Sequence, residues 1–149
     1  MFLTAAVVFL LDFFSKWLIQ QSMGLQETIP LIRNVFHITY IHNRGAAFGI
    51  LQQQTGLFIL ITVLVLVAIL WYHRQLPQSD RVAHLALGLV FGGSVGNLVD
   101  RIRWGYVIDW LDFRIWPIFN LADSAIVVGG LLLAWTMMAR KSPSESSDV

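Results

Sequence analysis

Five aspartates at or near the ends of apolar segments are the residues of this 149-residue chain with the clearest chemical potential: Asp12, Asp100, Asp109, Asp112 and Asp123. Acidic residues are costly there and are usually functional. Two carboxylates in a partly desolvated site cannot both ionise easily, so one keeps a proton near neutral pH while the other acts as a base. Such a pair can activate water and polarise a peptide carbonyl, which is the chemistry of peptide-bond hydrolysis.

Three of these acids are expected on the same side of the molecule. Asp100 ends one apolar segment and Asp123 begins the next, and the two segments run in opposite directions. Asp109 lies between them, and its apolar neighbours indicate a position at a membrane surface. The three carboxylates can therefore converge. The alternative is that they form ion pairs with neighbouring cations, namely Arg101, Arg103 and Arg114.

The remaining polar pair near the start of the chain has a structural interpretation. Asp12 and Lys16 are one helical turn apart, with the acid on the N-terminal side, which is the favoured order for an ion pair on a helix. We expect this pair to support the structure rather than to react.

The elements that carry these groups are predicted to span a membrane. The chain is 56% apolar and only 13% charged, with a mean hydropathy of +0.67. A bilayer core requires about 20 apolar residues per helix. Four runs have nearly that length, and they predict an all-α bundle of four transmembrane helices: Phe2–Ile19, Gly56–Tyr72, Val82–Val99 and Phe119–Met138.

Small residues in the third and fourth runs predict that both helices pack tightly within the bundle. Gly88, Gly92 and Gly96 recur at helical spacing in the third run, and Ala125 and Gly129 do so in the fourth. The second run is rich in Leu, Ile and Val and carries no charge between Leu57 and Leu70, which is typical of a lipid-facing helix.

A small β-sheet is predicted outside the hydrocarbon, between the first two spans. Residues 36–42 alternate in polarity and are followed by a turn at Asn43-Arg44-Gly45. We assign residues 28–51 to this sheet. Residues 1–141 are expected to form a single integral membrane domain, followed by a disordered tail over 142–149.

Composition excludes several other functions. The chain has no cysteine, which removes thiolate nucleophiles and Cys-ligated metals, and its net charge of +1 provides no field for nucleic acid.

The stretch Gly92–Gly96 matches the Gly-x-Ser-x-Gly motif of a nucleophile elbow. That motif acts at a turn from a strand to a helix, whereas this stretch lies in an apolar helix. The four histidines lack metal-binding spacing. No metal and no cofactor are assigned.

Four blocks of the sequence resemble, in order, the signatures of the lipoprotein signal peptidases, also called signal peptidase II. Together with the four-span plan, the resemblance covers nearly the whole chain. The blocks are Asp12–Lys16, Asn43–Gly49, Gly96–Arg101 running on to Val107–Asp109, and Phe119–Ser124.

This resemblance implies an aspartyl endopeptidase that removes signal peptides from diacylglyceryl-modified prolipoproteins, just before the lipidated cysteine. The catalytic pair maps onto Asp109 and Asp123, with Asp100 as the rival candidate. Residues implied to bind substrate are Asn43, Gly45, Asn97, Arg101 and Asn120. Residues implied to support the site are Asp12, Lys16, Asp100 and Ala122.

The resemblance also implies a location and partners. The protein is expected in the bacterial cytoplasmic (inner) membrane, with its termini in the cytoplasm and its site at the extracytoplasmic face. A count of positive charges alone would place the large loops in the cytoplasm. The expected partners are the prolipoprotein substrate, membrane lipids and globomycin-type inhibitors, and the expected state is a monomer that binds no nucleic acid.

Two functions of other classes stay open on the sequence. Acids near membrane ends can carry ions, which would suit a small transporter or proton-relay protein. A non-catalytic scaffold that binds acylated peptides is the other alternative. Ion flux would favour the first, and binding without turnover would favour the second.

Overall fold

Four long apolar helices form the body of the protein in a computed structural model that describes residues 1–45 and 54–141. All four are long and apolar enough to cross a membrane. They confirm the predicted spans, with ends that differ by a few residues: α1 (Phe2–Ser22), α2 (Thr55–His73), α3 (Arg81–Trp104) and α4 (Leu121–Lys141). The expected tail over 142–149 and residues 46–51 of the expected sheet segment lie outside the described residues.

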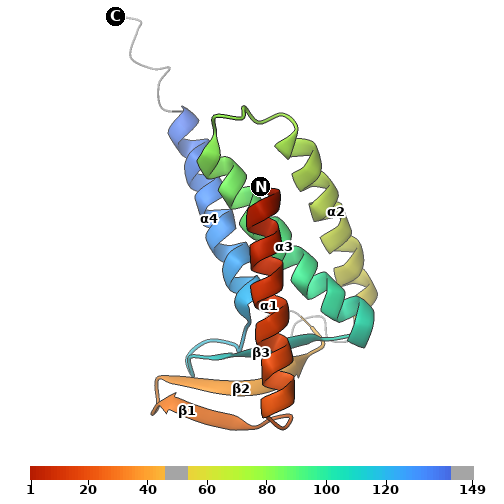
Figure 1. Cartoon of the computed structure of the whole chain (residues 1–149), viewed down its shortest axis with the longest axis vertical. Coiled ribbons are helices and arrows are strands. Elements are labelled where there is room, and N and C mark those ends of the chain that lie inside the picture. The colour runs from red at the N-terminus through yellow and green to blue at the C-terminus, as the bar shows by residue number, and fades with distance from the viewer. Residues whose placement is uncertain (46–53, 142–149) are drawn as a thin grey trace, which may run out of the picture.

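A three-stranded antiparallel sheet lies across one end of the helices (Figure 1). Its strands, in spatial order, are β1 (Thr28–Ile32), β2 (Phe36–Asn43) and β3 (Val107–Asp112). The first two come from the connection between α1 and α2, as the alternating pattern predicts. The third comes from the connection between α3 and α4, which the sequence interpretation assigned to no strand. Asp109 therefore lies within the sheet, where it pairs with Ile41 of β2.

Helix α3 is the centre of the bundle and packs against each of the other three helices. Its glycines allow this close approach, as the small-residue pattern predicts. A Cβ atom at Gly92 would lie 2.5 Å from the backbone oxygen of Ala5 in α1, and one at Gly93 would lie 2.4 Å from that of Ala122 in α4. Ser94 is buried in the middle of the same helix, so the Gly-x-Ser-x-Gly stretch forms no nucleophile elbow.

Helix α2 packs on α3 and leaves most of its apolar surface exposed, which agrees with a lipid-facing role. In Figure 1 it stands away from α1 and α4. Two apolar clusters hold the ends of the molecule. Ile19, Met23, Tyr40 and Ile108 join α1 to the sheet, and at the other end the cluster is Ile69, Leu76, Ala83 and Leu87.

Neighbouring glycines in α4 provide a matched test of this packing. A Cβ atom at Gly129 would lie 2.7 Å from the backbone oxygen of Ala86, whereas one at Gly130 would meet nothing within 4 Å. Because overpacking costs about 1–3 kcal/mol, we expect Gly129→Ala to lower the free energy of unfolding by that amount. Gly130→Ala should not lower it and can raise it by up to about 1 kcal/mol, because alanine is the better helix former. Unfolding of the detergent-solubilised protein measures both, and equal effects would contradict the packing described.

Candidate active site

Asp109 and Asp123 line one cavity of about 340 Å³ where the helices meet the sheet. Asp109 is on β3 and is 1% exposed, and Asp123 lies in the first turn of α4. Asn43, Gly45 and Arg101 line the same cavity. The structure thus brings together both aspartates of the predicted pair and three of the residues expected to bind substrate.

The position of Asp123 is fixed by the start of its own helix. The side-chain oxygen of Asn120 accepts a hydrogen bond from the backbone N–H of Asp123 at 2.8 Å. In return, Oδ2 of Asp123 accepts one from the backbone N–H of Asn120 at 3.3 Å. This is a reciprocal cap, and it satisfies backbone donors that a helix start leaves unpaired. The spacing Asn-x-x-Asp therefore serves to cap the start of α4 as well as to place the two side chains at the site.

The same Asn120 side chain also reaches Asp109. Its Nδ2 donates to Oδ1 of Asp109 at 2.7 Å, and Asn120 is fully buried. The other oxygen of Asp109, Oδ2, accepts from Nδ2 of Asn43 at 2.8 Å. Asn43 is itself held by the backbone N–H of Gly45, which donates to its side-chain oxygen at 3.0 Å. Two amides from separate segments therefore hold the Asp109 carboxyl group.

Burial changes the protonation of Asp109. Desolvation, followed by the nearby charge of Asp123, raises the pKa of Asp109 from 3.8 to about 7. The hydrogen bonds from Asn43 and Asn120 oppose this rise, but they do not cancel it. Asp109 thus titrates near neutral pH, and the two carboxylates titrate as a pair.

A buried ion-pair network lies behind the cavity. The ammonium of Lys16 contacts Asp12 at 2.7 Å and Asp100 at 2.9 Å, which confirms the expected Asp12–Lys16 contact and adds a second acid to it. Nζ of Lys16 also donates to Oδ1 of Asn97 at 3.1 Å. Nδ2 of Asn97 donates to Oδ1 of Asp123 at 2.7 Å. A chain of contacts therefore runs from Lys16 to the Asp123 carboxylate.

Asp12 also fixes the start of α4. Its Oδ1 accepts a hydrogen bond from the backbone N–H of Ala122 at 3.0 Å. Ala122 is fully buried, and the Cβ that Gly96 lacks would lie only 3.5 Å from the Cβ of Ala122 and 2.5 Å from Oδ2 of Asp12. Small residues are thus needed at both positions.

Asp100 does not join the other two acids, so the expected convergence of three carboxylates is wrong. Its Oδ2 faces Lys16 and accepts from the backbone N–H of Ile108 at 3.2 Å. It is absent from the residues that line the cavity. Through this hydrogen bond, Asp100 instead holds Ile108 of β3 against α3. Ile108 is the residue just before Asp109.

Among the described residues, Asp100, Asp109 and Asp123 form no ion pair with an arginine, so the alternative expected for them is not seen. Asp112 forms such a pair instead. Its Oδ2 accepts from Arg114 at 2.9 Å and from Oγ1 of Thr39 at 2.7 Å. These hydrogen bonds outweigh burial and lower the pKa of Asp112 below its usual value. Arg101 lines the cavity, and its guanidinium lies 5.0 Å from the ring centroid of Phe58 rather than in an ion pair with Asp112.

Among the described residues, no three or more His, Asp or Glu side chains gather in a way that could hold a metal ion. His42 stacks on Tyr106 with ring centroids 3.7 Å apart and contacts the hydroxyl of Tyr40 at 2.9 Å. His73 and His84 pair with each other at the other end of the bundle.

Comparison with known proteins decides the family. Residues 4–139 match the sequence model of the family described as signal peptidase (SPase) II. The chain belongs to the signal peptidase II family. It is 52% identical over 132 residues to the lipoprotein signal peptidase of Halothermothrix orenii, an alignment that covers 89% of this chain and 90% of that protein. The lipoprotein signal peptidase of Pelotomaculum thermopropionicum is 44% identical, over 99% and 97% of the two chains.

Two solved structures share the fold of this chain. A bacterial membrane enzyme structure obtained by the in meso method at 2.3 Å resolution has a TM-score of 0.91 and 31% identity, over 99% of this chain and 92% of that one. A second, at 1.9 Å resolution, has a TM-score of 0.82 and 32% identity, over 95% and 92% of the two chains. The predicted fold class is confirmed, and this signal peptidase II family member is a multi-pass bacterial membrane protein.

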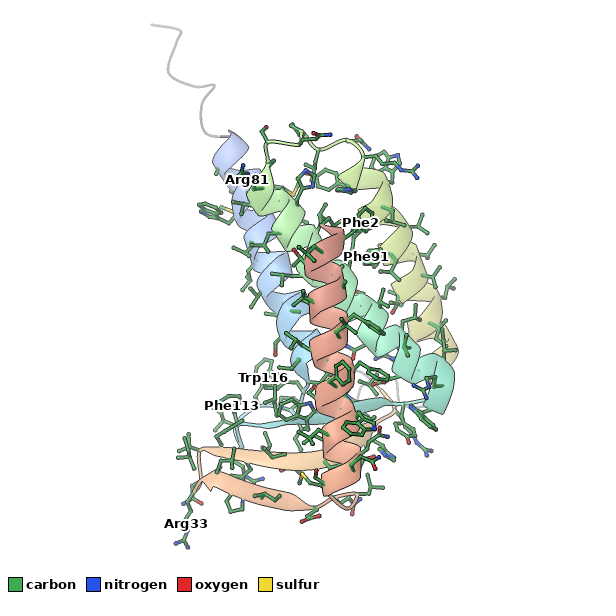
Figure 2. The ribbon with its side chains drawn as sticks, viewed as in Figure 1. Phe2, Arg33, Arg81, Phe91, Phe113 and Trp116 are labelled. Carbon is green, nitrogen blue, oxygen red and sulfur yellow. The ribbon has the colours of Figure 1, made fainter. Side chains whose placement is uncertain are left out.

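Several cavity residues were not assigned to the site from the sequence. They come from the segment before α4 and from the first turns of that helix, and they are Trp116, Pro117, Ile118, Phe119, Ile126 and Val127. In Figure 2 the side chain of Trp116 lies where α4 approaches the sheet. Phe119 is tied to β3, because its backbone exchanges hydrogen bonds with Leu111 at 2.8 and 3.1 Å. Their proximity to the Asp123 block was the available signal.

Removing the cation from the buried network should strongly destabilise the protein. Lys16→Met leaves Asp12 and Asp100 facing each other without the ammonium, and breaking a buried ion pair in this way costs about 3–5 kcal/mol. Arg114→Met provides the control, because the Arg114 side chain is 48% exposed. That exposed pair should contribute at most about 1 kcal/mol to the free energy of unfolding. A small effect of Lys16→Met would contradict the network.

The raised pKa of Asp109 also predicts a pH dependence of stability. The unfolded chain protonates Asp109 at the ordinary pKa of 3.8, and the folded chain does so at about 7. The resulting stability is full below 3.8 and is lost as pH rises through about 7. We expect the free energy of unfolding to fall by a few kcal/mol across this range, and Asp109→Asn to flatten the fall. In the control Asp112→Asn, the fall in the free energy of unfolding near pH 7 should remain. If Asp109→Asn showed the same fall as the native protein, Asp109 would not be the group that titrates near pH 7.

Proposed function

We propose that this protein is an aspartyl endopeptidase that cleaves signal peptides from diacylglyceryl-modified prolipoproteins, with Asp109 and Asp123 as its catalytic pair. Family membership supports the substrate class. The observation that carries the residue assignment is the shared cavity, in which a carboxyl group with a pKa of about 7 faces a second carboxylate. One acid and one base are then present together near neutral pH.

The roles of the two acids follow from their surroundings. Asp123 receives hydrogen bonds from Asn97 and from the start of α4, where the helix dipole favours a negative charge. Asp109 is the more deeply buried of the two. We therefore assign the ionised form to Asp123, as the base, and the proton to Asp109, as the acid.

The proposed reaction conserves every proton. Asp123 takes a proton from water as the water oxygen attacks the scissile carbonyl carbon, while Asp109 gives its proton to the carbonyl oxygen. Asp123 then transfers its proton to the amide nitrogen, and the C–N bond breaks. Asp109 recovers its proton from the hydroxyl oxygen of the collapsing intermediate. The products are a signal peptide ending in a carboxylic acid and a free amine on the cysteine.

An apolar groove beside the cavity supports a lipid-modified substrate. It has a volume of about 480 Å³ and shares Trp116, Phe119, Asp123 and Val127 with the catalytic cavity. Its other lining residues, apart from Ser124, are apolar: Phe113, Ile115 and Val128. Acyl chains on the residue after the scissile bond can lie in this groove while the bond itself reaches the acids. Asn43, Gly45 and Arg101, at the cavity wall, are proposed to hold the substrate backbone.

We propose that the site faces the extracytoplasmic side of the bacterial inner membrane and that the termini are cytoplasmic. The count of positive charges suggests the opposite orientation. It is a weaker argument here, because four of the cations near the site contact neighbouring side chains. They are Lys16 in the buried network, Arg101 over Phe58, Arg103 with its guanidinium 5.1 Å from the Trp104 ring centroid, and Arg114 on Asp112. All the proposed site groups come from residues 1–141 of one chain, so a monomer that is a single domain suffices.

The transport alternative is less well supported by the arrangement of charge. The acids Asp100, Asp109 and Asp123 lie at one end of the bundle, and α2 carries no acidic or basic residue before His73. No line of ionisable side chains across the membrane is present in the described residues. A scaffold that only binds acylated peptides would need no acid–base pair.

The catalytic assignment predicts a sharp contrast between aspartates. Asp109→Asn and Asp123→Asn should each lower kcat for a diacylglyceryl-modified prolipoprotein peptide by at least about 10²-fold, because each removes a proton-transfer group. The double variant should be little worse than either single variant, because the two groups act as a unit. The measurement is peptide cleavage in detergent with a chelator present, at equal amounts of folded protein.

Asp112→Asn is the matched control, because Asp112 lies on the same strand but outside the cavity. It should retain most of the activity. Full activity of Asp109→Asn with loss in Asp100→Asn would move the pair to Asp100 and Asp123. Binding of the peptide by the native protein without any cleavage would favour the scaffold instead.

A further inference from the structure

A second and larger cavity lies at the end of the bundle opposite the aspartates. It is a hollow of about 770 Å³ that is open to the outside, and it is bordered by the start of α1, the end of α2, the start of α3 and the connection between α2 and α3. Figure 2 shows Arg81 at this end, with the sheet at the other. The proposed reaction uses none of its residues.

The charged residues that line this cavity are of one sign. Arg74 and Arg81 approach it from the end of α2 and the start of α3, and the imidazoles of His73 and His84 line it as well. Among the residues that the structure describes, no carboxylate lines it. The nearest acid in sequence, Asp80, caps α3 by accepting from the backbone N–H of Ala83 at 3.0 Å. The cavity is thus a basic hollow.

The two histidines form an ordered donor chain. Nε2 of His84 lies 3.1 Å from the backbone oxygen of Pro77, which can only accept, so this nitrogen carries a proton. Nδ1 of His84 lies 3.1 Å from Nδ1 of His73, within hydrogen-bond distance. This leaves Nε2 of His73 as the nitrogen of the pair with no hydrogen bond to any described residue.

The cavity also has an apolar side that continues into the bundle. Leu76 and Leu85 line it, and Leu76 is buried in the cluster with Ile69, Ala83 and Leu87. The position coincides with the ends of three candidate membrane spans, α1, α2 and α3. A membrane presents phosphate groups at this depth, above the acyl chains. Basic pockets between transmembrane helices are known to hold the head groups of anionic lipids.

We propose that this cavity binds the phosphate of an anionic phospholipid. The guanidinium groups of Arg74 and Arg81 and the amide of Gln78 supply donors for the phosphate oxygens. The side of the cavity formed by Leu76 and Leu85 faces the first part of the acyl chains. Arginines that only set the membrane topology need not line a hollow with an apolar side. Arg74 and Arg81 line one together with Leu76 and Leu85.

The test uses the full chain in detergent and three probes: phosphatidylglycerol, phosphatidylcholine with the same acyl chains, and inorganic phosphate. Native mass spectrometry counts the lipids retained, and a lipid titration of the melting temperature gives affinities. Arg74→Gln and Arg81→Gln are the variants. Arg33→Gln is the matched control, because Arg33 is an exposed arginine at the tip of the sheet (Figure 2).

We expect phosphatidylglycerol to bind more tightly than phosphatidylcholine, and each cavity variant to weaken its binding about fivefold, which is the effect of about 1 kcal/mol per basic residue. Arg33→Gln should bind like the native protein. Equal loss in all three variants would mean diffuse charge attraction and would overturn the site. Equal binding of both lipids, or protection by inorganic phosphate at the same concentration as the lipid, would overturn the lipid assignment.

Discussion

The side-chain amide of Asn120 connects the two halves of the site, and most of the surrounding structure serves to place it. Its oxygen accepts from the backbone of Asp123 at 2.8 Å, and its nitrogen donates to the carboxyl group of Asp109 at 2.7 Å. The fully buried side chain of Asn120 thus joins the start of α4 to strand β3. Leaving a buried amide or its partner unpaired costs about 1–3 kcal/mol, so the two aspartates hold a fixed relation.

The rest of the bundle keeps this group dry and in place. The Lys16 ammonium contacts both Asp12 and Asp100 behind the site, and Asn97 links it to Asp123. Asp12 in turn holds the N–H of Ala122, two residues after Asn120. Close packing of α3 on α1 and α4 requires Gly92 and Gly93, which leave no room for a side chain. The burial that raises the pKa of Asp109 is therefore a consequence of how the helices pack.

The sequence was sufficient for the parts that depend on composition and on short, specific motifs. Apolar runs of membrane length predicted all four helices, and alternation over residues 36–42 predicted β2. The motif blocks selected Asp109 and Asp123, which share a cavity. The ion pair of Asp12 with Lys16 followed from their spacing.

The remaining features depend on long-range contacts. Strand β3 was not predicted, because only six residues form it and its burial comes from pairing with β2 and packing on Ile19 and Tyr40. Asp100 was expected beside the other acids, but Lys16, which is 84 positions away, and the backbone of Ile108 hold it elsewhere. The reciprocal cap of Asn120 and Asp123 was visible as Asn-x-x-Asp and was not recognised as a cap.

We propose that Asp109 and Asp123 share one proton at working pH. The pH dependence of kcat/KM for the diacylglyceryl-modified peptide measures this, because that profile reports the ionisation of the free enzyme. We expect kcat/KM to be highest when one of the two acids is protonated and to fall as pH rises through about 7, where Asp109 loses its proton. A kcat/KM that instead rises through pH 7 to an alkaline plateau would require two ionised carboxylates and would exclude a shared proton.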